Sequence, residues 1–95
     1  MVKVMFKKLS LELGGKNATI ILKDADLEIA VEGAVRAAFT NSGQVCLCGS
    51  RILIDASIAD VFSKLFVEKV NEIRVGDPLD ENSTMGSVIS AEHLE

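Results

Sequence analysis

The sequence predicts an α/β fold with a partial parallel sheet, in the order β-β-α-β-α. Two observations predict it: short apolar or β-branched runs, and two longer stretches with helical periodicity lying between and after them. Strands that alternate with helices are typical of parallel sheets. The 95 residues allow one small domain or part of one, and the balance of 48% hydrophobic and 25% charged residues is typical of a globular chain.

Residues 8–13 (KLSLEL) alternate apolar and polar side chains, which predicts a first strand. The adjacent Gly14 and Gly15 end it, because paired glycines interrupt regular structure. Residues 18–22 (ATIIL) form a β-branched run that fits a second, buried strand.

A first helix is predicted over residues 27–39, with Asp26 as its N-cap. Its apolar positions cover most of the circumference, so we expect it to be buried on several sides. Gly43, after Asn41 and Ser42, is expected to end it in the left-handed conformation.

Residues 51–54 (RILI) predict the third strand. Ser57 is the expected N-cap of a second, amphipathic helix, which extends to Ile73 and stops before Gly76 and Pro78. A polar, turn-rich segment follows over residues 79–95. A three-stranded sheet would have two open edges, and the mean hydropathy is high at +0.32, so the chain is interpreted as a segment of a larger sheet.

Composition argues against several classes of function. Fourteen acids against ten bases give a net charge of −4, and no long basic cluster exists, so a nucleic-acid partner is not expected. No apolar run is long enough to span a membrane, and no signal-peptide pattern is found, so we expect no membrane partner and a cytoplasmic location. Two cysteines separated by one residue cannot make a disulfide framework, which favours a reducing compartment.

Glu12 is the first candidate site residue. It stands at the end of a predicted strand beside a glycine pair, where the carboxyl edge of an α/β sheet often carries a ligand site. The simpler interpretation is the solvent-facing polar residue of an alternating strand, and the pattern alone favours that. The glycine pair does not belong to a phosphate-binding loop of either common type.

Cys46 is the second candidate, in a loop after the first helix, where a thiol can be exposed and backbone N–H groups can receive an oxyanion. The pattern alone favours a buried, small apolar residue instead. Cys48 and the single histidine, His93, add too few ligands for zinc, so no metal site is expected. His93 lies in the polar tail and is expected to be solvated.

Together, two segments resemble the aldehyde dehydrogenase superfamily. LELGGKN at residues 11–17 is similar to its glutamate motif, and FTNSGQVC at residues 39–46 is similar to its cysteine motif, at the family's spacing. The resemblance continues through GSR at residues 49–51 and VGDP at residues 75–78. The fold implied is a segment of the family's catalytic domain.

The resemblance implies that Cys46 is the nucleophile and Glu12 the general base in oxidation of an aldehyde to a carboxylic acid through a thioester. It implies NAD or NADP as cofactor, with the backbone around Leu13 near the nicotinamide, and no catalytic role for Cys48. A stand-alone thiol hydrolase using Cys46 and Glu12 is a weaker alternative.

Members of that family are several times longer. We therefore expect residues 1–95 to be a partial catalytic domain that lacks the nucleotide-binding segment, the upstream oxyanion asparagine and the oligomerisation segment. The full-length form is expected to be a homo-oligomer, and the isolated chain to be inactive. The alternative is a truncated, non-catalytic remnant that misfolds or binds a full-length relative.

Overall fold

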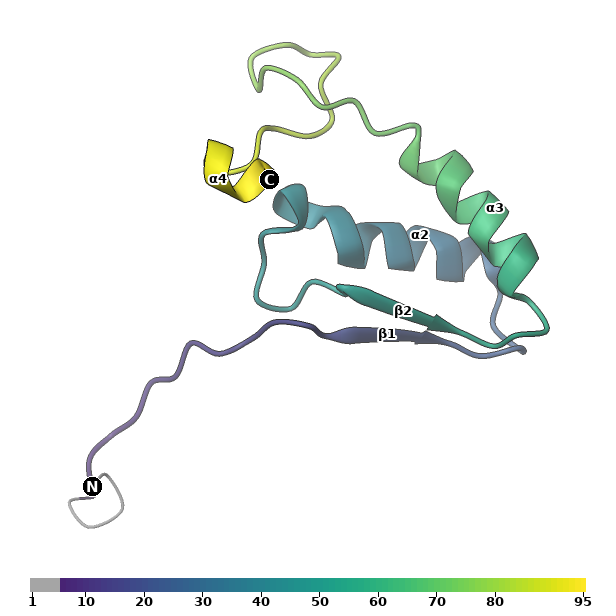
Figure 1. Cartoon of the computed structure of the whole chain (residues 1–95), viewed down its shortest axis with the longest axis horizontal. Coiled ribbons are helices and arrows are strands. Elements are labelled where there is room, and N and C mark those ends of the chain that lie inside the picture. Colours follow the sequence, from purple (N-terminus) through teal and green to yellow (C-terminus); the bar gives the residue numbers. More distant parts are fainter. Residues whose placement is uncertain (1–5) are drawn as a thin grey trace.

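The computed structural model describes residues 6–95, and its centre is a strand–helix–strand unit (Figure 1). Strands β1 (Ala18–Ile21) and β2 (Arg51–Ile54) pair in parallel, with Ala18 opposite Arg51 and Ile21 opposite Ile54. Helix α2 (Leu27–Phe39) connects them. The parallel sheet and the α/β class predicted from the sequence are confirmed.

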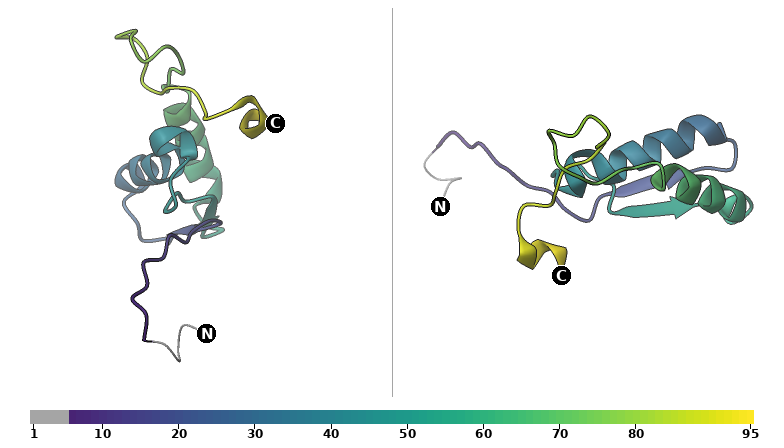
Figure 2. Two further views of the ribbon diagram at one scale, coloured as in Figure 1. Left: turned by 90° about the vertical axis from the view of Figure 1, so that its left-hand side faces the viewer. Right: turned by 90° about the horizontal axis from the view of Figure 1, so that it is seen from above.

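Helices α2 and α3 (Ala59–Val70) both lie on one side of this two-stranded sheet (Figures 1 and 2). The core lies between these layers and consists of Ile21, Val31, Ala34 and Phe62, of which Phe62 is only 1% exposed. Phe62 and Phe66 stack with ring centroids 5.9 Å apart, which fixes α3 against its neighbours. So small a core makes each of its members important for stability.

The other face of the sheet is bare. Ile21 is buried, whereas Ile20 on the same strand is 65% exposed and Leu53 on β2 is 54% exposed. Successive side chains of a strand point to opposite faces, so helices on one side cover every second residue. The prediction that residues 18–22 form a buried strand is correct for one face only.

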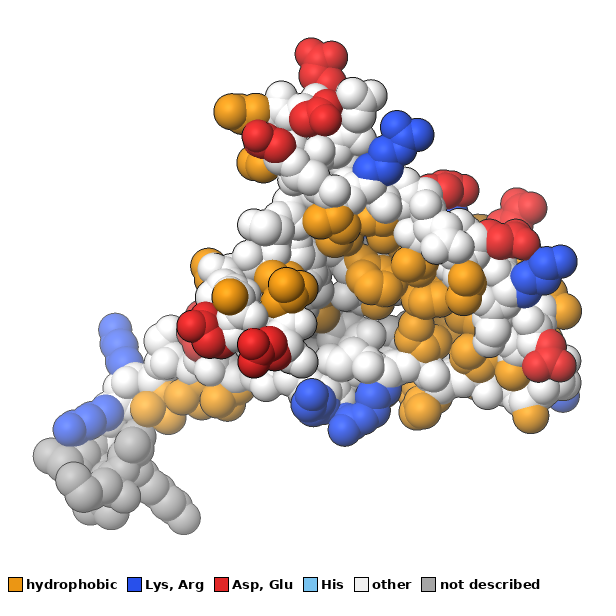
Figure 3. Space-filling model, turned by 45° about the horizontal axis from the view of Figure 1, so that its top comes forward, with side chains coloured by type: hydrophobic (Ala, Val, Ile, Leu, Met, Phe, Trp, Pro, Cys, Tyr) orange, Lys and Arg blue, Asp and Glu red, His pale blue; other side chains and the backbone are white. Residues whose placement is uncertain are grey.

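The predicted strand over residues 8–13 does not form. Leu9, Leu11 and Leu13 are 61%, 65% and 76% exposed, and no strand among residues 6–95 pairs with this segment. Figure 3 shows hydrophobic side chains lining the part of the chain beside the grey N-terminal residues. An alternating pattern makes a strand only where another strand offers its backbone groups.

The ends of α2 confirm the expected signals. The Asp26 carboxylate accepts the N–H of Ile29 at 3.1 Å, as an N-cap does. Gly43 has a φ of +75°, at the end of the 3-10 segment η1 (Thr40–Gly43). The prediction that this helix is buried on several sides is wrong for the described structure, because the Ile29 side of α2 is open and Ile29 is 71% exposed.

Helix α3 differs from its prediction at both ends. Its N-cap is Ile58, and Ser57 instead donates its N–H and its hydroxyl to the Asp55 carboxylate at 2.9 and 2.7 Å. This local turn uses the side chain that the capping pattern had suggested for the helix. The helix ends at Val70, before the predicted stop.

The segment that follows α3 turns back on itself and then ends in a short helix. The N–H of Gly76 donates to the carbonyl of Met85 at 3.0 Å. Helix α4 (Ala91–Leu94) lies at the C-terminal end. Within residues 6–95, no helix combines the length and apolar character that a membrane crossing requires.

Candidate active site

The segment that carries Glu12 meets the loop that carries Cys46. The contact is made by Gly14: a Cβ built there would lie 2.5 Å from the Cys46 carbonyl oxygen and 2.9 Å from its Cβ. Distances this short are sterically forbidden, so only glycine lets the two backbones approach so closely. The structure thus brings the glutamate segment and the cysteine loop together although 34 residues separate the two candidate side chains.

Asn17 joins the same two segments by hydrogen bonds. Its side-chain Nδ2 donates to the Cys46 carbonyl at 2.7 Å and to the Cys48 carbonyl at 3.3 Å. Sequence reasoning did not single out Asn17, although it closes the motif that contains Glu12. Its position directly after the Gly-Gly-Lys run was the available signal.

The loop around Cys46 is a tight turn over residues 45–48. The Cys48 N–H donates to the Val45 carbonyl at 2.9 Å, and the next N–H, from Gly49, donates to the Ala37 carbonyl of α2 at 2.9 Å. Cys46 stands exposed on this turn, whereas Cys48 is buried. The interpretation of Cys46 as a buried apolar residue is therefore wrong, because the turn points its side chain to solvent.

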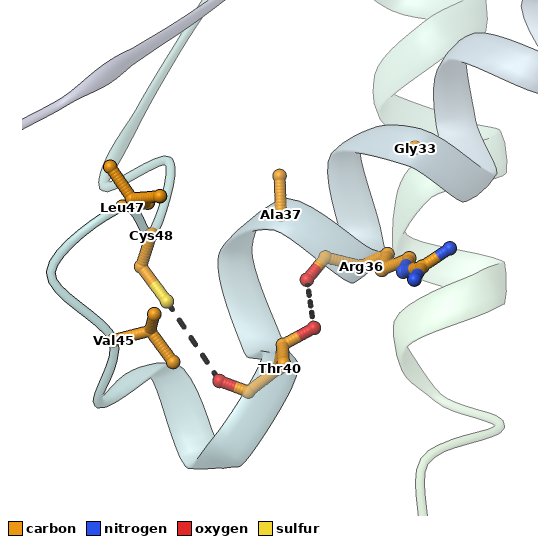
Figure 4. A pocket seen from close by; sticks show the side chains of 7 residues that line it. All are labelled: Gly33, Arg36, Ala37, Thr40, Val45, Leu47 and Cys48. Carbon is orange, nitrogen blue, oxygen red and sulfur yellow. Dashed lines mark hydrogen bonds between the residues drawn. The ribbon is translucent and has the colours of Figure 1, made fainter.

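Cys48 faces the helix rather than the candidate site. Its thiol donates to the Thr40 carbonyl at 3.8 Å, and it lines an open hollow of about 300 Å³ between α2 and the turn (Figure 4). The residues around that hollow are Gly33, Arg36, Ala37, Thr40, Val45, Leu47 and Cys48. Neither Glu12 nor Cys46 lines it, so the hollow is not where these two side chains meet a ligand.

Residues 86–89, which are distant in sequence, form hydrogen bonds with the residues that directly precede the cysteine turn. The Ser42 hydroxyl lies 3.0 Å from the Gly86 carbonyl, to which it donates, and Gln44 Oε1 accepts the N–H of Ile89 at 3.1 Å. More than forty residues separate these partners. In each bond, a side chain near the turn pairs with a backbone group of the distant segment. Because every residue type carries that backbone carbonyl, and every type except proline that N–H, the sequence gives no signal for the pairing.

The remaining predicted residues are less constrained. Glu12 and Leu13 are both exposed, and no hydrogen bond within residues 6–95 holds the Glu12 carboxylate. His93 is exposed on α4, as expected for a solvated residue. The structure therefore builds the thiol side of the site more completely than the carboxylate side.

Comparison with known proteins identifies the family. The sequence pattern of the Aldehyde dehydrogenase family matches residues 2–95, further toward the N-terminus than the motifs alone. This chain belongs to the aldehyde dehydrogenase family. The recognition made from residues 11–17 and 39–46 is thereby confirmed.

The matched relatives are dehydrogenases named for different aldehydes. The chain is 50% identical over 93 residues to a lactaldehyde dehydrogenase of Methanocaldococcus jannaschii, covering 98% of the chain and 20% of that relative. It is 52% identical to the 2-aminomuconic semialdehyde dehydrogenase of Mus musculus, covering 94% of the chain and 18% of that relative. The chain thus spans about a fifth of the length of the curated relatives it matches.

Solved structures show the same fold. A betaine aldehyde dehydrogenase from Staphylococcus aureus, in complex with NAD+, matches with a TM-score of 0.81 and 48% identity, over 86% of this chain and 16% of that one. An Escherichia coli NADP-dependent enzyme matches with a TM-score of 0.87 and 38% identity, over 95% of this chain and 19% of that one. The strand–helix–strand unit is therefore the fold of this part of the family.

Proposed function

We propose that this chain is the part of an NAD(P)-dependent aldehyde dehydrogenase catalytic domain that supplies the nucleophile, Cys46, and the general base, Glu12. The observation that carries the proposal is the contact of Gly14 with Cys46, which places the glutamate segment against an exposed thiol. A thiol that acts as a nucleophile must be accessible, and the base must be able to reach the same reacting carbon.

The Cys46 thiolate would attack the aldehyde carbon, forming an S–C bond and a thiohemiacetal oxyanion. Among residues 6–95 the Cys46 N–H has no hydrogen-bond acceptor, so it is free to donate to this oxyanion. Bound NAD or NADP would supply the acceptor for the hydride that leaves this carbon, and loss of the hydride would leave a thioester on Cys46. The backbone around Leu13 would lie near the nicotinamide end of that cofactor, and the 76% exposure of Leu13 supports this.

Glu12 would take a proton from a water molecule, which attacks the thioester carbon. The C–S bond breaks, the carboxylic acid leaves and the Cys46 thiolate is regenerated. Splitting the reaction this way gives the covalent step to a strong nucleophile and the proton transfer to a carboxylate. The substrate proposed is an aldehyde, as in the names of the relatives.

The test is a chimera in which residues of this chain replace the matching 93 residues of the M. jannaschii lactaldehyde dehydrogenase. We expect it to reduce NAD or NADP with lactaldehyde. Cys46→Ser should abolish turnover and labelling by iodoacetamide at this position. Glu12→Gln should still form the acyl-enzyme but hydrolyse it slowly. An active Cys46→Ser chimera would contradict the proposal, and Cys48→Ser, expected to retain activity, is the matched control.

The isolated chain is expected to give no steady production of NADH from an aldehyde and NAD. The physical reason is that residues 12–46 hold the proposed thiol and carboxylate, whereas neither glycine-rich phosphate loop occurs in the sequence. Absorbance at the nicotinamide band, measured with the purified 95-residue chain, checks this. Sustained turnover by the chain alone would show that it binds the cofactor unaided.

A second candidate is a non-catalytic chain that binds a full-length relative. The exposed Ile20, Leu22 and Leu53 on the bare sheet face favour it, because open apolar strands pair with other chains. Size-exclusion chromatography of the chain with and without the M. jannaschii enzyme separates the two candidates. Co-elution with loss of the relative's activity would support binding, and separate elution would exclude it for this relative.

A further inference from the structure

Asn17 is the point at which the sheet, the glutamate segment and the cysteine turn are connected. Its backbone carbonyl accepts the N–H of Arg51 at 3.1 Å, so its main chain is fixed where β2 begins to pair with β1. The neighbouring Lys16 carbonyl accepts Nη1 of Arg51 at 2.8 Å. The Asn17 side chain therefore extends from an anchored backbone.

From that anchor, one amide group reaches two carbonyls of the cysteine turn. Nδ2 has two hydrogens, and the two acceptors are the carbonyls of Cys46 at 2.7 Å and of Cys48 at 3.3 Å. Holding both carbonyls toward Asn17 fixes the orientation of the intervening peptide groups. A turn held in this way cannot rotate without breaking two hydrogen bonds.

The same contact holds the backbone of the cysteine turn against the segment that carries Glu12. With the Cys46 carbonyl bonded to Asn17, the Cys46 backbone lies directly over Gly14, two residues after Glu12. The Cys46 N–H belongs to the peptide group on the other side of the same Cα and is left without an acceptor among residues 6–95. Asn17 thus holds the carbonyl side of Cys46 and leaves its N–H side available.

We propose that Asn17 is a positioning residue, which orients the Cys46 turn so that the thiol and the Cys46 N–H meet the substrate in a fixed arrangement. This role rests on the proposed function of Cys46. A displacement of about 1 Å in a reacting group lowers turnover by roughly a hundredfold, so loss of these two bonds should affect kcat more than KM.

The first experiment measures the hydrogen bonds themselves. The chain has only two cysteines, so labelling with cysteine that carries ¹³C at the carbonyl gives two NMR signals, and these are the two acceptors of Asn17. In Asn17→Asp the donor is replaced by an ionised oxygen of the same shape. We expect the Cys46 signal to move toward the shift of a carbonyl without a hydrogen bond. The Cys48 signal should move less, because its carbonyl still accepts the N–H of Ser50 at 3.0 Å.

The pH dependence separates a lost donor from a general disturbance. A protonated carboxyl group carries an O–H that can donate. As the pH falls through the pKa of the introduced carboxyl, at least one signal should therefore return toward its original position. Asn82→Asp is the matched control, because Asn82 is exposed and, among residues 6–95, bonds only within its own turn at Asp80. Unchanged cysteine signals in a folded Asn17→Asp chain would overturn the proposed hydrogen bonding.

The second experiment tests positioning in the lactaldehyde dehydrogenase chimera. We expect Asn17→Asp to lower kcat by ten- to a hundredfold with a KM within threefold, and Asn82→Asp to leave both unchanged. If Cys46→Ser is inactive but Asn17→Asp is as active as the starting chimera, the positioning role is wrong and the nucleophile stands. If Cys46→Ser remains active, the proposed function itself fails.

Discussion

The cysteine turn and the glutamate segment contact each other, yet they are held in different ways. Within the turn, the Cys48 N–H donates to the Val45 carbonyl at 2.9 Å. Directly after it, the Gly49 N–H donates to the Ala37 carbonyl of α2 at 2.9 Å, and Asn17 Nδ2 donates to the Cys46 carbonyl at 2.7 Å. The segment over residues 8–13 has no paired strand in the described structure, and all of its leucines are largely exposed. The described contacts with the turn come from the residues that follow this segment, Gly14 and Asn17.

The strand–helix–strand unit therefore holds the cysteine turn in place but does not hold the segment that carries Glu12. The thiol side of the site depends on a short turn that is hydrogen-bonded to α2 and to Asn17, directly before β1. All of these elements lie within the described chain. The carboxylate side depends on residues 8–13, which pair with no strand among residues 6–95. We infer that the position of Cys46 is a property of this unit, whereas no hydrogen bond among residues 6–95 holds the Glu12 carboxylate.

The largest effect should come from a substitution in the core of the strand–helix–strand unit. Phe62→Ala deletes the most buried large side chain, and such changes cost about 3–5 kcal/mol. That is comparable with the whole stability of a small domain, so we expect loss of cooperative unfolding, measured by circular dichroism during denaturation. A variant that unfolds as the parent chain does would mean that the core around Phe62 does not hold the unit together.

Gly14→Ala should separate the glutamate segment from the cysteine turn at their closest backbone approach. A methyl group there overlaps the Cys46 carbonyl, so the two segments must separate. We expect about a hundredfold loss of kcat in the lactaldehyde dehydrogenase chimera.

Gly33→Ala is the control for that prediction, because no atom lies within 4 Å of its added Cβ. It replaces a glycine inside α2 and should stabilise the chain by about 0.5–1 kcal/mol without loss of activity. Equal activities of the two variants would remove Gly14 from the site.

Asp26→Ala should weaken α2 at the end remote from the cysteine turn. Loss of an N-cap costs about 1 kcal/mol, which denaturant unfolding of the 95-residue chain can measure. The carbonyl signals of Cys46 and Cys48 should not move, because the turn is bonded near the other end of α2. A shift in those signals would show that the turn responds to the whole helix.

The smallest effect lies outside both segments, at the carboxyl end of β2. Hydrogen bonds from the hydroxyl and the N–H of Ser57 hold the pKa of Asp55 below its ordinary value. The folded pKa is depressed, so this interaction stabilises the fold above the ordinary pKa and is lost as the pH falls through the folded value. Ser57→Ala should raise the Asp55 pKa toward its ordinary value, measured by NMR titration of the carboxyl carbon. An unchanged value would assign the shift to the backbone N–H alone.

Local signals in the sequence predicted local structure well. Asp26 caps α2, Gly43 ends the following turn with a positive φ, and residues 18–21 and 51–54 form strands. Each of these outcomes depends on contacts within a few residues. Ser57 differed because two local hydrogen-bonding schemes compete there, and the turn at Asp55 forms in place of the cap.

The sequence by itself determined the strand–helix–strand order, the family and the two candidate side chains, because these depend on local periodicity and on two contiguous motifs. The tertiary structure decided that Cys46 is exposed and Cys48 buried, that Gly14 and Asn17 hold the cysteine turn, and that residues 8–13 do not pair. Burial and strand pairing require partners distant in sequence. Neither can be read from the alternation of side chains along one segment.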